Sequence, residues 1–327
     1  DALADKLDID PLTFRLMNTL RDGLENVAGE VMQNVGVSEC LERAANAIDW
    51  FDGPLEWTTA EGKHRGKGIA CFIKLTGTPS TTSVLLRMNN DGTVTLLSGS
   101  REMGQGVETV LPQIASSVLG VDVERIIMSP VDTAFTPYDK TTTSSRSTFH
   151  GGLAVIEAAH DMVYQLKELM ARHWNCSVDA ITFENGIFEC LSEPGIRLDI
   201  NSPSFAKFMK EEPPIVALGR YGTKDIFIPP DPETHQSKRP TIMWMMGAQA
   251  VEVEVDPKTG RTTIIRVGAA HDVGKAINPR ACKQQIEGGV LMGVGNALSE
   301  EMIYVDGVLV NGGMADYKIP TSMDADF

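Results

Sequence analysis

The stretch REMGQGVETVLPQIA, residues 101–115, decides the expected fold, because a glycine turn in it joins a strand to a helix. Alternating β-type residues over 93–98 precede the turn, and apolar residues recur at helical spacing from 107 to 119. A second strand is expected over 125–131. The order of strand, glycine turn, helix and strand indicates a mixed α/β fold.

Two later segments also place a loop at the start of a helix. The tract TTTSSRST (141–148) is followed by Gly151-Gly152 and by a helical pattern over 153–174. Asn278-Pro279 introduces a helix over 280–298, with Asn278 suited to cap the first turn and Pro279 suited to begin it. The chain therefore contains three loop-to-helix entrances of the same kind.

The remaining segments complete a mixed α/β pattern. Short helices are expected within the first 50 residues, one of them starting at Pro11 with Asp10 as its cap. A boundary is expected near 51–66, after which strand-like segments alternate with turns. Turn residues at 256–260 and at Asp306-Gly307 predict two hairpins.

Composition excludes several classes of protein. The chain has 327 residues, and 29 Lys and Arg against 44 Asp and Glu give a net charge of -15, which disfavours nucleic acid and anionic membranes as partners. No run approaches the roughly 20 apolar residues of a membrane span, and the first residues are acidic where a signal peptide is basic. These features predict a cytoplasmic protein. The five cysteines are scattered without a C-x-x-C pair, so we expect no metal to be ligated by the protein itself.

Each helix entrance is a candidate binding site for an anion. The first turn of a helix has unpaired backbone N–H groups and a partial positive charge, which together favour a phosphate or a similar oxygen. At Gly104-Gln105-Gly106 the glycines allow close approach of the main chain, the amide of Gln105 both donates and accepts, and Thr109 adds a hydroxyl. The alternative is an ordinary strand-to-helix turn.

The tract 141–148 holds seven hydroxyls and one guanidinium in eight residues, a dense set of donors for phosphate and ribose oxygens. A flexible, solvated loop is the alternative for this tract. Gln285 lies two turns into the third helix, and a solvated polar face is its alternative. We expect residues from all three entrances to bind one ligand. The candidates are Gly104, Gln105, Gly106, Thr109, Thr142, Thr143, Ser144, Ser145, Arg146, Ser147 and Gln285.

Four segments in order resemble the molybdopterin-binding subunits of the xanthine dehydrogenase family. They are REMGQGVETVLPQIA (101–115), DTAFTPYDKTTTSSRSTFHGGLAV (132–155), HDVGKAINPRACKQQIEGGVLMGVGNALSEE (271–301) and DYKIPT (316–321). The opening DIDPLTFRLMN (8–18) resembles the segment that joins the two molybdenum domains of that family. The resemblance covers essentially the whole chain. Within the family it is most similar to members whose molybdenum subunit is split into two chains, as in nicotinate dehydrogenase, where it would be the medium subunit.

This resemblance implies a domain division. Residues 1–60 would be the helical segment that joins from the first molybdenum domain. Residues 61–327 would form the second molybdenum-cofactor-binding domain, in two α/β halves at about 61–235 and 236–327. The glutamate base of the family lies beyond Phe327, and the first half of the subunit is outside this sequence. The resemblance therefore implies a chain that is inactive alone.

The same resemblance implies a hydroxylase of N-heteroaromatic carbons that takes oxygen from water. Its cofactor would be molybdopterin cytosine dinucleotide with molybdenum bearing a terminal sulfur or selenium. Residues 104–106 would contact the pterin or the metal's oxo face, residues 142–147 the pterin and its phosphates, Gln285 the pterin near molybdenum, and Asp272 the nucleotide end. The implied partners are a large molybdopterin subunit, an iron–sulfur subunit with 2Fe-2S clusters and an FAD subunit. The alternatives are an aldehyde or carbon monoxide oxidising relative and a non-catalytic cofactor-binding or assembly module.

Overall fold

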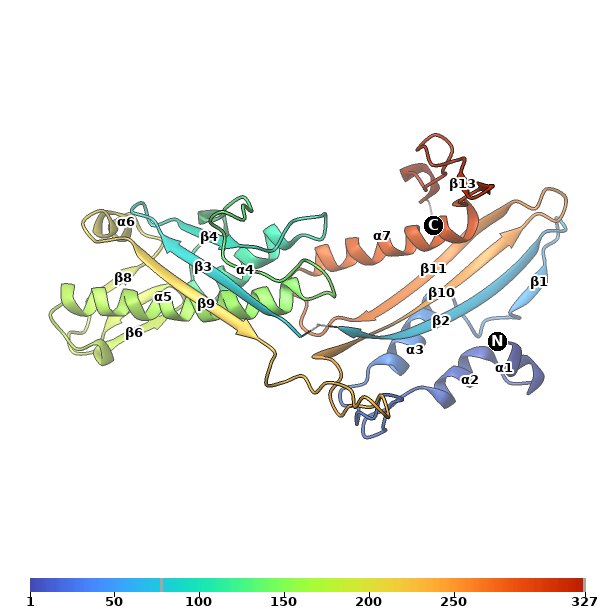
Figure 1. Ribbon diagram of the computed structural model, residues 1–327, viewed down its shortest axis with the longest axis horizontal. Helices are drawn as coiled ribbons and strands as arrows, with labels where there is room; N and C mark the ends of the chain where they lie inside the picture. The colour runs from blue at the N-terminus through green and yellow to red at the C-terminus, as the bar shows by residue number, and fades with distance from the viewer. Residues whose placement is uncertain (77–78, 326–327) are drawn as a thin grey trace. The chain divides into compact units, whose positions relative to one another are not determined.

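The computed structural model describes residues 1–76 and 79–325, which divide into two compact units (Figure 1). The first unit comprises Asp1–Leu75, Pro229–Pro240 and the residues from Trp244 onward. The second unit comprises Thr76–Ile228 and Thr241–Met243. Each unit combines a sheet with helices, which confirms the expected mixed α/β class. The domain boundary at residue 60, which the family resemblance implies, is a different kind of division from these two compact units. It stays a prediction.

The second unit is built on a four-stranded sheet with helices packed against it (Figure 1). Its strands alternate between buried apolar and outer residues, as a sheet with one covered face requires. The hairpin strands β3 and β4 are antiparallel, and β4 pairs in parallel with β5 through the helical crossover. In the order of the sheet the strands are β5 (Ile126–Met128), β4 (Val94–Ser98), β3 (Thr81–Met88) and β9 (Ile215–Gly222), with helices α4 (Val107–Leu119) and α5 (Gly152–His173).

Helix α5 lies very close to strand β9. A Cβ added at Gly219 would come within 1.8 Å of the carbonyl oxygen of Ala154, so only glycine permits this approach. Beyond α5 a small antiparallel sheet extends the same core through Ile181, Phe188 and Cys190. Its strands are β6 (Ile181–Glu184), β7 (Ile187–Cys190) and β8 (Arg197–Asp199), followed by helix α6 (Pro203–Met209).

The first unit is built on a second four-stranded sheet. Helix α3 (Val37–Ala47) packs on its strand β11, where a Cβ at Gly268 would meet the carbonyl oxygen of Ala44 at 2.3 Å. Leu41, Ile69 and Ala248 belong to the apolar core between them. The sheet order is β1 (Glu56–Thr58), β2 (His64–Thr76), β10 (Met243–Val255) and β11 (Thr262–Asp272); the other elements are α1 (Ala2–Lys6), α2 (Pro11–Asn18), α7 (Pro279–Leu298), β12 (Tyr304–Val305) and β13 (Val308–Leu309).

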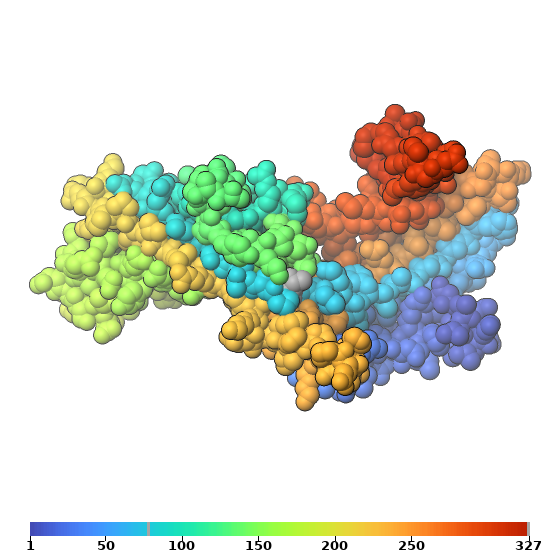
Figure 2. Space-filling view, viewed as in Figure 1, coloured from blue at the N-terminus to red at the C-terminus, as the bar shows by residue number. Residues whose placement is uncertain are grey.

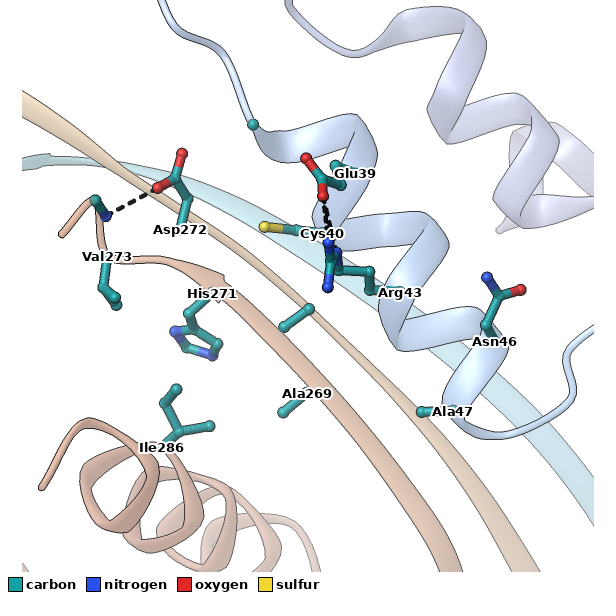
Figure 3. Close-up of a pocket in the computed structure, with 13 residues that line it drawn as sticks. Glu39, Cys40, Arg43, Asn46, Ala47, Ala269, His271, Asp272, Val273 and Ile286 are labelled. Carbon is teal, nitrogen blue, oxygen red and sulfur yellow. Dashed lines mark hydrogen bonds and ion pairs between the residues drawn. The ribbon is translucent and has the colours of Figure 1, made fainter. Parts of the chain in front are cut away.

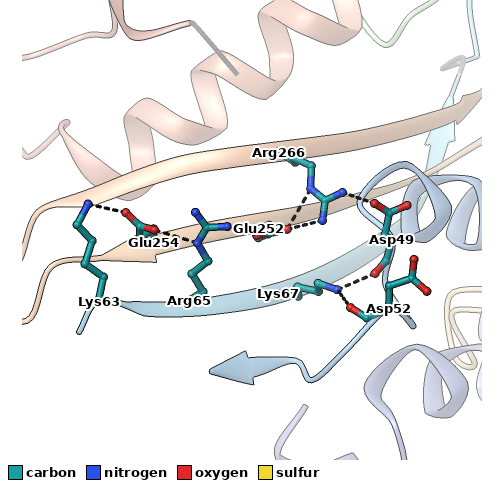
Figure 4. Close-up of polar contacts among 8 residues, drawn as sticks. All are labelled: Asp49, Asp52, Lys63, Arg65, Lys67, Glu252, Glu254 and Arg266. Carbon is teal, nitrogen blue, oxygen red and sulfur yellow. Dashed lines mark hydrogen bonds and ion pairs between the residues drawn. The ribbon is translucent and has the colours of Figure 1, made fainter. Parts of the chain in front are cut away.

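A row of ion pairs crosses the strands of this sheet (Figure 4). Glu252 of β10 is almost fully buried, and its carboxylate pairs with Arg65 of β2 at 3.1 Å and with Arg266 of β11 at 2.6 Å. Glu254 pairs with both Lys63 and Arg65, and these two cations lower the pKa of its carboxyl group. Each of these two carboxylates has two cationic partners, and the pairs of Glu252 link strands β2, β10 and β11.

Most local expectations are confirmed. Asn278 caps α7 by accepting a hydrogen bond from the backbone N–H of Ala281, and Pro279 is the first residue of the helix. The hairpins around 256–260 and 306–307 are present. The strand expected over 125–131 is shorter, because residues 123–125 form a 3-10 turn and only Ile126–Met128 pair with β4. Among the described residues no helix is long and apolar enough to span a bilayer.

Candidate functional site

The loop before α4 has the backbone geometry that its two glycines predict. Gly104 and Gly106 have φ of 98° and 83°, in the left-handed region that favours glycine. Gly106 is the N-cap residue of α4, which begins at Val107. The loop is solvent-accessible at Gly104 and half-buried at Gln105 and Gly106.

A carboxylate of the protein lies at the start of α4. Glu102 accepts backbone N–H groups from Gly104 at 2.8 Å, Gly106 at 2.9 Å and Glu108 at 3.0 Å. Burial raises the pKa of Glu102, but these N–H donors outweigh it and the net pKa is lowered. For the N–H groups of Gly104, Gly106 and Glu108, the expectation of donors left unpaired for a ligand is therefore wrong. An acidic residue four positions before the N-cap is a signal that could have predicted this arrangement.

The side chain of Gln105 also folds back on its own loop. Its Nε2 donates to the carbonyl oxygen of Arg101 at 2.8 Å, and its Oε1 accepts from the backbone N–H of Met103 at 2.6 Å. An amide has two donor hydrogens and two acceptor positions, so these bonds use half of its capacity. Gln105 thus holds the glycine loop in shape.

The hydroxyl loop, residues 141–148, has an outer and an inner side. Thr141, Thr143, Ser145 and Thr148 are exposed, whereas Ser147 is buried. Ser144 and Ser145 both have left-handed backbones, with φ of 52° and 54°. A left-handed backbone costs roughly 1–3 kcal/mol for each residue other than glycine. It persists where contacts with the surrounding structure stabilise it. A π-helical turn, Ser147–Gly151, then leads into α5.

Arg146 supplies those surroundings from inside the loop. Its side chain is fully buried and ion-pairs through Nη1 with Oδ1 of Asp139, whose side chain is 1% exposed. The guanidinium also donates to the carbonyl oxygen of Thr141 at 2.7 Å and to Oγ of Ser80 at 3.0 Å. The expectation of a guanidinium facing a ligand is corrected, since its hydrogen bonds go to the protein.

The structure brings the glycine loop and the hydroxyl loop together. Oδ2 of Asp139 accepts a hydrogen bond of 2.8 Å from Oγ of Ser100, which directly precedes the glycine loop. The backbone N–H of Arg101 donates to Oγ1 of Thr142 at 2.8 Å. One buried ion pair and one hydroxyl therefore fix both loops in the same region of the second unit. Sequence reasoning missed Asp139, because its partners are 39 and 7 residues away and no local pattern predicts the pairing.

Two predicted residues, Asp272 and Gln285, lie in the first unit. Gln285 is on α7, and Asp272 ends β11, where its Oδ1 accepts from the backbone N–H of Gly274 at 3.0 Å. Asp272 lines an open cavity of about 880 Å³ between α3 and the end of β11 (Figure 3). Convergence of Asp272 and Gln285 with the loops of the second unit stays a prediction.

Burial shifts the pKa values of two side chains that line this cavity (Figure 3). Burial lowers the pKa of His271, whose Nε2 has no hydrogen-bond partner among the described residues. Burial likewise raises the pKa of the Cys40 thiol. Arg43 lies beside them and pairs with Glu39 at 2.7 Å. Sequence reasoning did not single out this cavity.

Comparison with known proteins identifies the protein family of the chain. The sequence profile of the molybdopterin cofactor-binding domain matches residues 43–326, most of the chain. The chain belongs to this family. This finding agrees with the two loops, which place glycine, amide and hydroxyl groups side by side.

The individual relatives include a subunit described as molybdenum-binding. The chain is 31% identical over 338 residues to the putative xanthine dehydrogenase molybdenum-binding subunit of Escherichia coli, and 28% identical to the nicotine 6-hydroxylase large subunit of Paenarthrobacter nicotinovorans. These alignments cover 99% and 98% of this chain but only 43% and 40% of the relatives. In fold it is similar to quinoline 2-oxidoreductase from Pseudomonas putida, with a TM-score of 0.77 at 23% identity over 99% of this chain and 42% of that one.

We predict that Asp139→Ala destabilises the protein by about 3–5 kcal/mol, because it leaves the buried guanidinium of Arg146 without its counter-charge. Urea unfolding measured by circular dichroism gives this difference. Glu39→Ala, which breaks an exposed pair with Arg43, is the control and should cost less than about 1 kcal/mol. Equal small losses in both variants would contradict the structural role of Asp139.

A second prediction concerns pH. His150 is buried beside Arg146 with neither ring nitrogen hydrogen-bonded among the described residues. Burial, and then the charge of Arg146, lower the pKa of His150 to about 4. An unfolded histidine titrates near pH ~6.5, so between these values the unfolded chain binds the extra proton and stability falls as the pH falls.

Replacing His150 by leucine should therefore flatten the loss of unfolding free energy between pH 6.5 and pH 4.5. Urea titrations of the two proteins at several pH values measure the slope. His160→Leu, which removes an exposed histidine of the adjoining helix, should keep the steeper slope of the unsubstituted protein. Identical slopes for the His150 variant and the unsubstituted protein would rule out this role.

Proposed function

We propose that this chain is a molybdopterin-binding subunit of a hetero-oligomeric hydroxylase that acts on an N-heteroaromatic carbon of a nicotinate-like substrate. Family membership supports the cofactor class. The single structural observation that supports the site is that the buried pair of Asp139 and Arg146 ties the hydroxyl loop to the residue before the glycine loop. In this reading the chain is the second molybdenum domain, residues 61–327, preceded by a joining segment over 1–60.

The donor set fits a phosphorylated pterin. A protein with a net charge of -15 can bind an anion if the local donors are hydroxyl and backbone N–H groups. The exposed residues Thr143 and Ser145 offer such donors, and Thr109 lies on the exposed side of α4. The carboxylate of Glu102 would repel a phosphate at the start of α4. We therefore assign the phosphates to the hydroxyl loop and the uncharged pterin ring to the glycine loop.

Each part of the site then has its own role. Backbone atoms of Gly104 and Gly106 allow the ring to approach closely, while Gln105 holds the loop and uses its remaining amide capacity toward the ring. Hydroxyls within 142–147 bind phosphate oxygens, and Arg146 positions them from beneath. Gln285 and Asp272 are proposed to add contacts near the metal and near the nucleotide. We propose the cytosine dinucleotide form, because the hydroxyl loop has enough donors for a pyrophosphate.

When bound, the molybdenum centre, with its terminal sulfur or selenium, oxidises the substrate with oxygen from water. Electrons would then pass to 2Fe-2S clusters and FAD on partner subunits. The chain spans less than half the length of the curated relatives it matches. We accordingly propose that a large molybdopterin subunit completes the site, that the glutamate base lies outside these residues, and that the chain alone is inactive. A cytoplasmic location is part of this proposal.

A second candidate is aldehyde oxidation. The chain is 26% identical to the aldehyde oxidoreductase from Desulfovibrio desulfuricans, with a TM-score of 0.75 over 98% of this chain and 32% of that one. A carbon monoxide oxidising enzyme shares the fold at 21% identity. Turnover of N-heteroaromatics, aldehydes and carbon monoxide by the purified complex separates these substrates. A non-catalytic assembly module would turn over none of them.

We predict that the purified native complex contains molybdenum and releases cytidine monophosphate on acid hydrolysis. Thr143→Val combined with Ser145→Ala should lower molybdenum per chain at least tenfold, because the two hydroxyls assigned to the phosphates are removed. Thr182→Val, at an exposed threonine of the small sheet in the same unit, is the control and should leave loading unchanged. A folded complex without molybdenum or pterin would refute the proposed function.

A further inference from the structure

Two cysteines of the second unit lie side by side, although fourteen positions separate them in the sequence. Cys176 follows the C-terminal end of α5, where its backbone N–H donates to the carbonyl oxygen of Ala171 at 2.9 Å. Cys190 is the last residue of β7 and lies opposite Ile181 of β6. The chain thus turns back on itself between the two cysteines. Their thiols are close enough for a side-chain hydrogen bond with each other.

The packing around the two cysteines holds both side chains in place. Cys190 is 1% exposed and belongs to the apolar core of this unit, and Cys176 packs against the same core. The backbone N–H of Leu191 donates to the carbonyl oxygen of Ala180 at 2.8 Å, which continues the pairing of β6 and β7 beyond Cys190. Both cysteines are free thiols. The fold therefore brings two reduced sulfurs together, as the formation of a disulfide bond requires.

Of the two thiols, that of Cys176 is the one that solvent can reach. Cys176 is half-buried and lines an open cavity of about 380 Å³ together with Arg172, Asn175 and Val178. Figure 2 shows the segment around residues 170–200, in yellow-green, at the surface of the second unit. Cys190, by contrast, is buried. A reagent that arrives from solvent therefore meets the sulfur of Cys176 first.

The two thiols also differ in acidity. The hydroxyl of Ser192, whose Oγ lies 3.2 Å from Sγ of Cys190, lowers the pKa of the Cys190 thiol against the opposing effect of burial. Burial, and then the neighbouring Cys190, raise the pKa of the Cys176 thiol. The attacking species in thiol–disulfide exchange is a thiolate. Cys190 is therefore suited to attack a sulfur that is already bonded to Cys176.

We propose that Cys176 and Cys190 form a reversible redox site, in which a small external disulfide oxidises both thiols to a disulfide bond between the end of α5 and strand β7. The proposal concerns these two thiols and does not depend on a bound cofactor. No short cysteine motif marks the site in the sequence, because the two residues meet only through the folding of η3 (Val178–Ala180) and the β6–β7 hairpin.

The reaction has two exchange steps. The thiolate of Cys176 first attacks one sulfur of the external disulfide, forms a bond to it and releases the other half, which takes up the proton of Cys176. The thiolate of Cys190 then attacks the sulfur of Cys176 and releases the second half, which takes up the proton of Cys190. The two protein thiols lose two electrons and two protons in total. The external disulfide gains them and leaves as two thiols.

The test uses the purified native complex, treated with oxidised glutathione at neutral pH and then alkylated to block the remaining thiols. An endopeptidase that cleaves after glutamate separates the two cysteines, because Glu184 and Glu189 lie between them. We expect most chains to give one peptide with Cys176 joined to another with Cys190, and dithiothreitol should release the two. Mass spectrometry of the digest with and without dithiothreitol measures this bond.

Three variants test the order of the steps. Cys190→Ser should stop at a mixed disulfide between glutathione and Cys176, because the second thiolate is missing. Cys176→Ser should leave Cys190 unmodified, because that thiol is buried. Cys282→Ser removes a half-buried cysteine of α7 and is the control, which should give the same joined peptides as the unsubstituted chain.

The unsubstituted complex alone decides the proposal even if a variant fails to fold. Absence of the joined peptides after treatment with oxidised glutathione would overturn it. Joined peptides that appear only after unfolding in urea would overturn it as well, since the folded chain would then not bring the sulfurs together. A glutathione adduct on Cys190 in folded Cys176→Ser protein would contradict the assignment of Cys176 as the thiol that reacts first.

Discussion

The buried ion pair between Asp139 and Arg146 is the constraint on which the binding loops depend. A guanidinium removed from water needs both a counter-charge and acceptors for its other N–H groups, and here Thr141, Thr81 and Ser80 supply them. The same carboxylate accepts from Ser100, which directly precedes the glycine loop. Two segments 40 residues apart in the chain are thereby fixed to one point, and the strained backbone at 144–145 is maintained.

In this arrangement the charged side chains of Arg146 and Asp139 lie inside the protein, below the exposed side of the hydroxyl loop. The positive charge of Arg146 is neutralised inside, so this residue presents no cation on the outer side of the hydroxyl loop, where Thr143 and Ser145 are exposed. Glu102 in turn accepts the backbone N–H groups of Gly104, Gly106 and Glu108 around the start of α4. The exposed hydroxyls of Thr143 and Ser145 thus lie in the loop that is tied to a glycine loop whose backbone can be approached closely. Such a surface suits a large polar cofactor that must be bound at many points without strong charge pairing.

Local features of this fold follow from local sequence, and long-range ones do not. Asn278-Pro279 predicts the start of α7 because capping involves residues three apart, and the hairpin at 306–307 follows from its turn residues. The inward turn of Arg146 and the role of Asp139 depend on strand β3 and on Ser100, which no pattern within 141–148 reveals. The role of Glu102 was missed for a different reason. The glycines predict accessible backbone N–H groups, but a nearby carboxylate of the protein accepts several of these groups. The four motifs predicted the family because they occur in the family's order over residues 101–321.

We propose that the hydroxyl loop is a binding surface shaped by a buried ion pair. Its most direct test is an experimental structure of the assembled, cofactor-loaded complex. We predict pterin phosphate oxygens within hydrogen-bonding distance of the Thr143 or Ser145 hydroxyls, with Arg146 still paired to Asp139 beneath them. A cofactor bound elsewhere, or one whose phosphates contact the guanidinium of Arg146 directly, would contradict it.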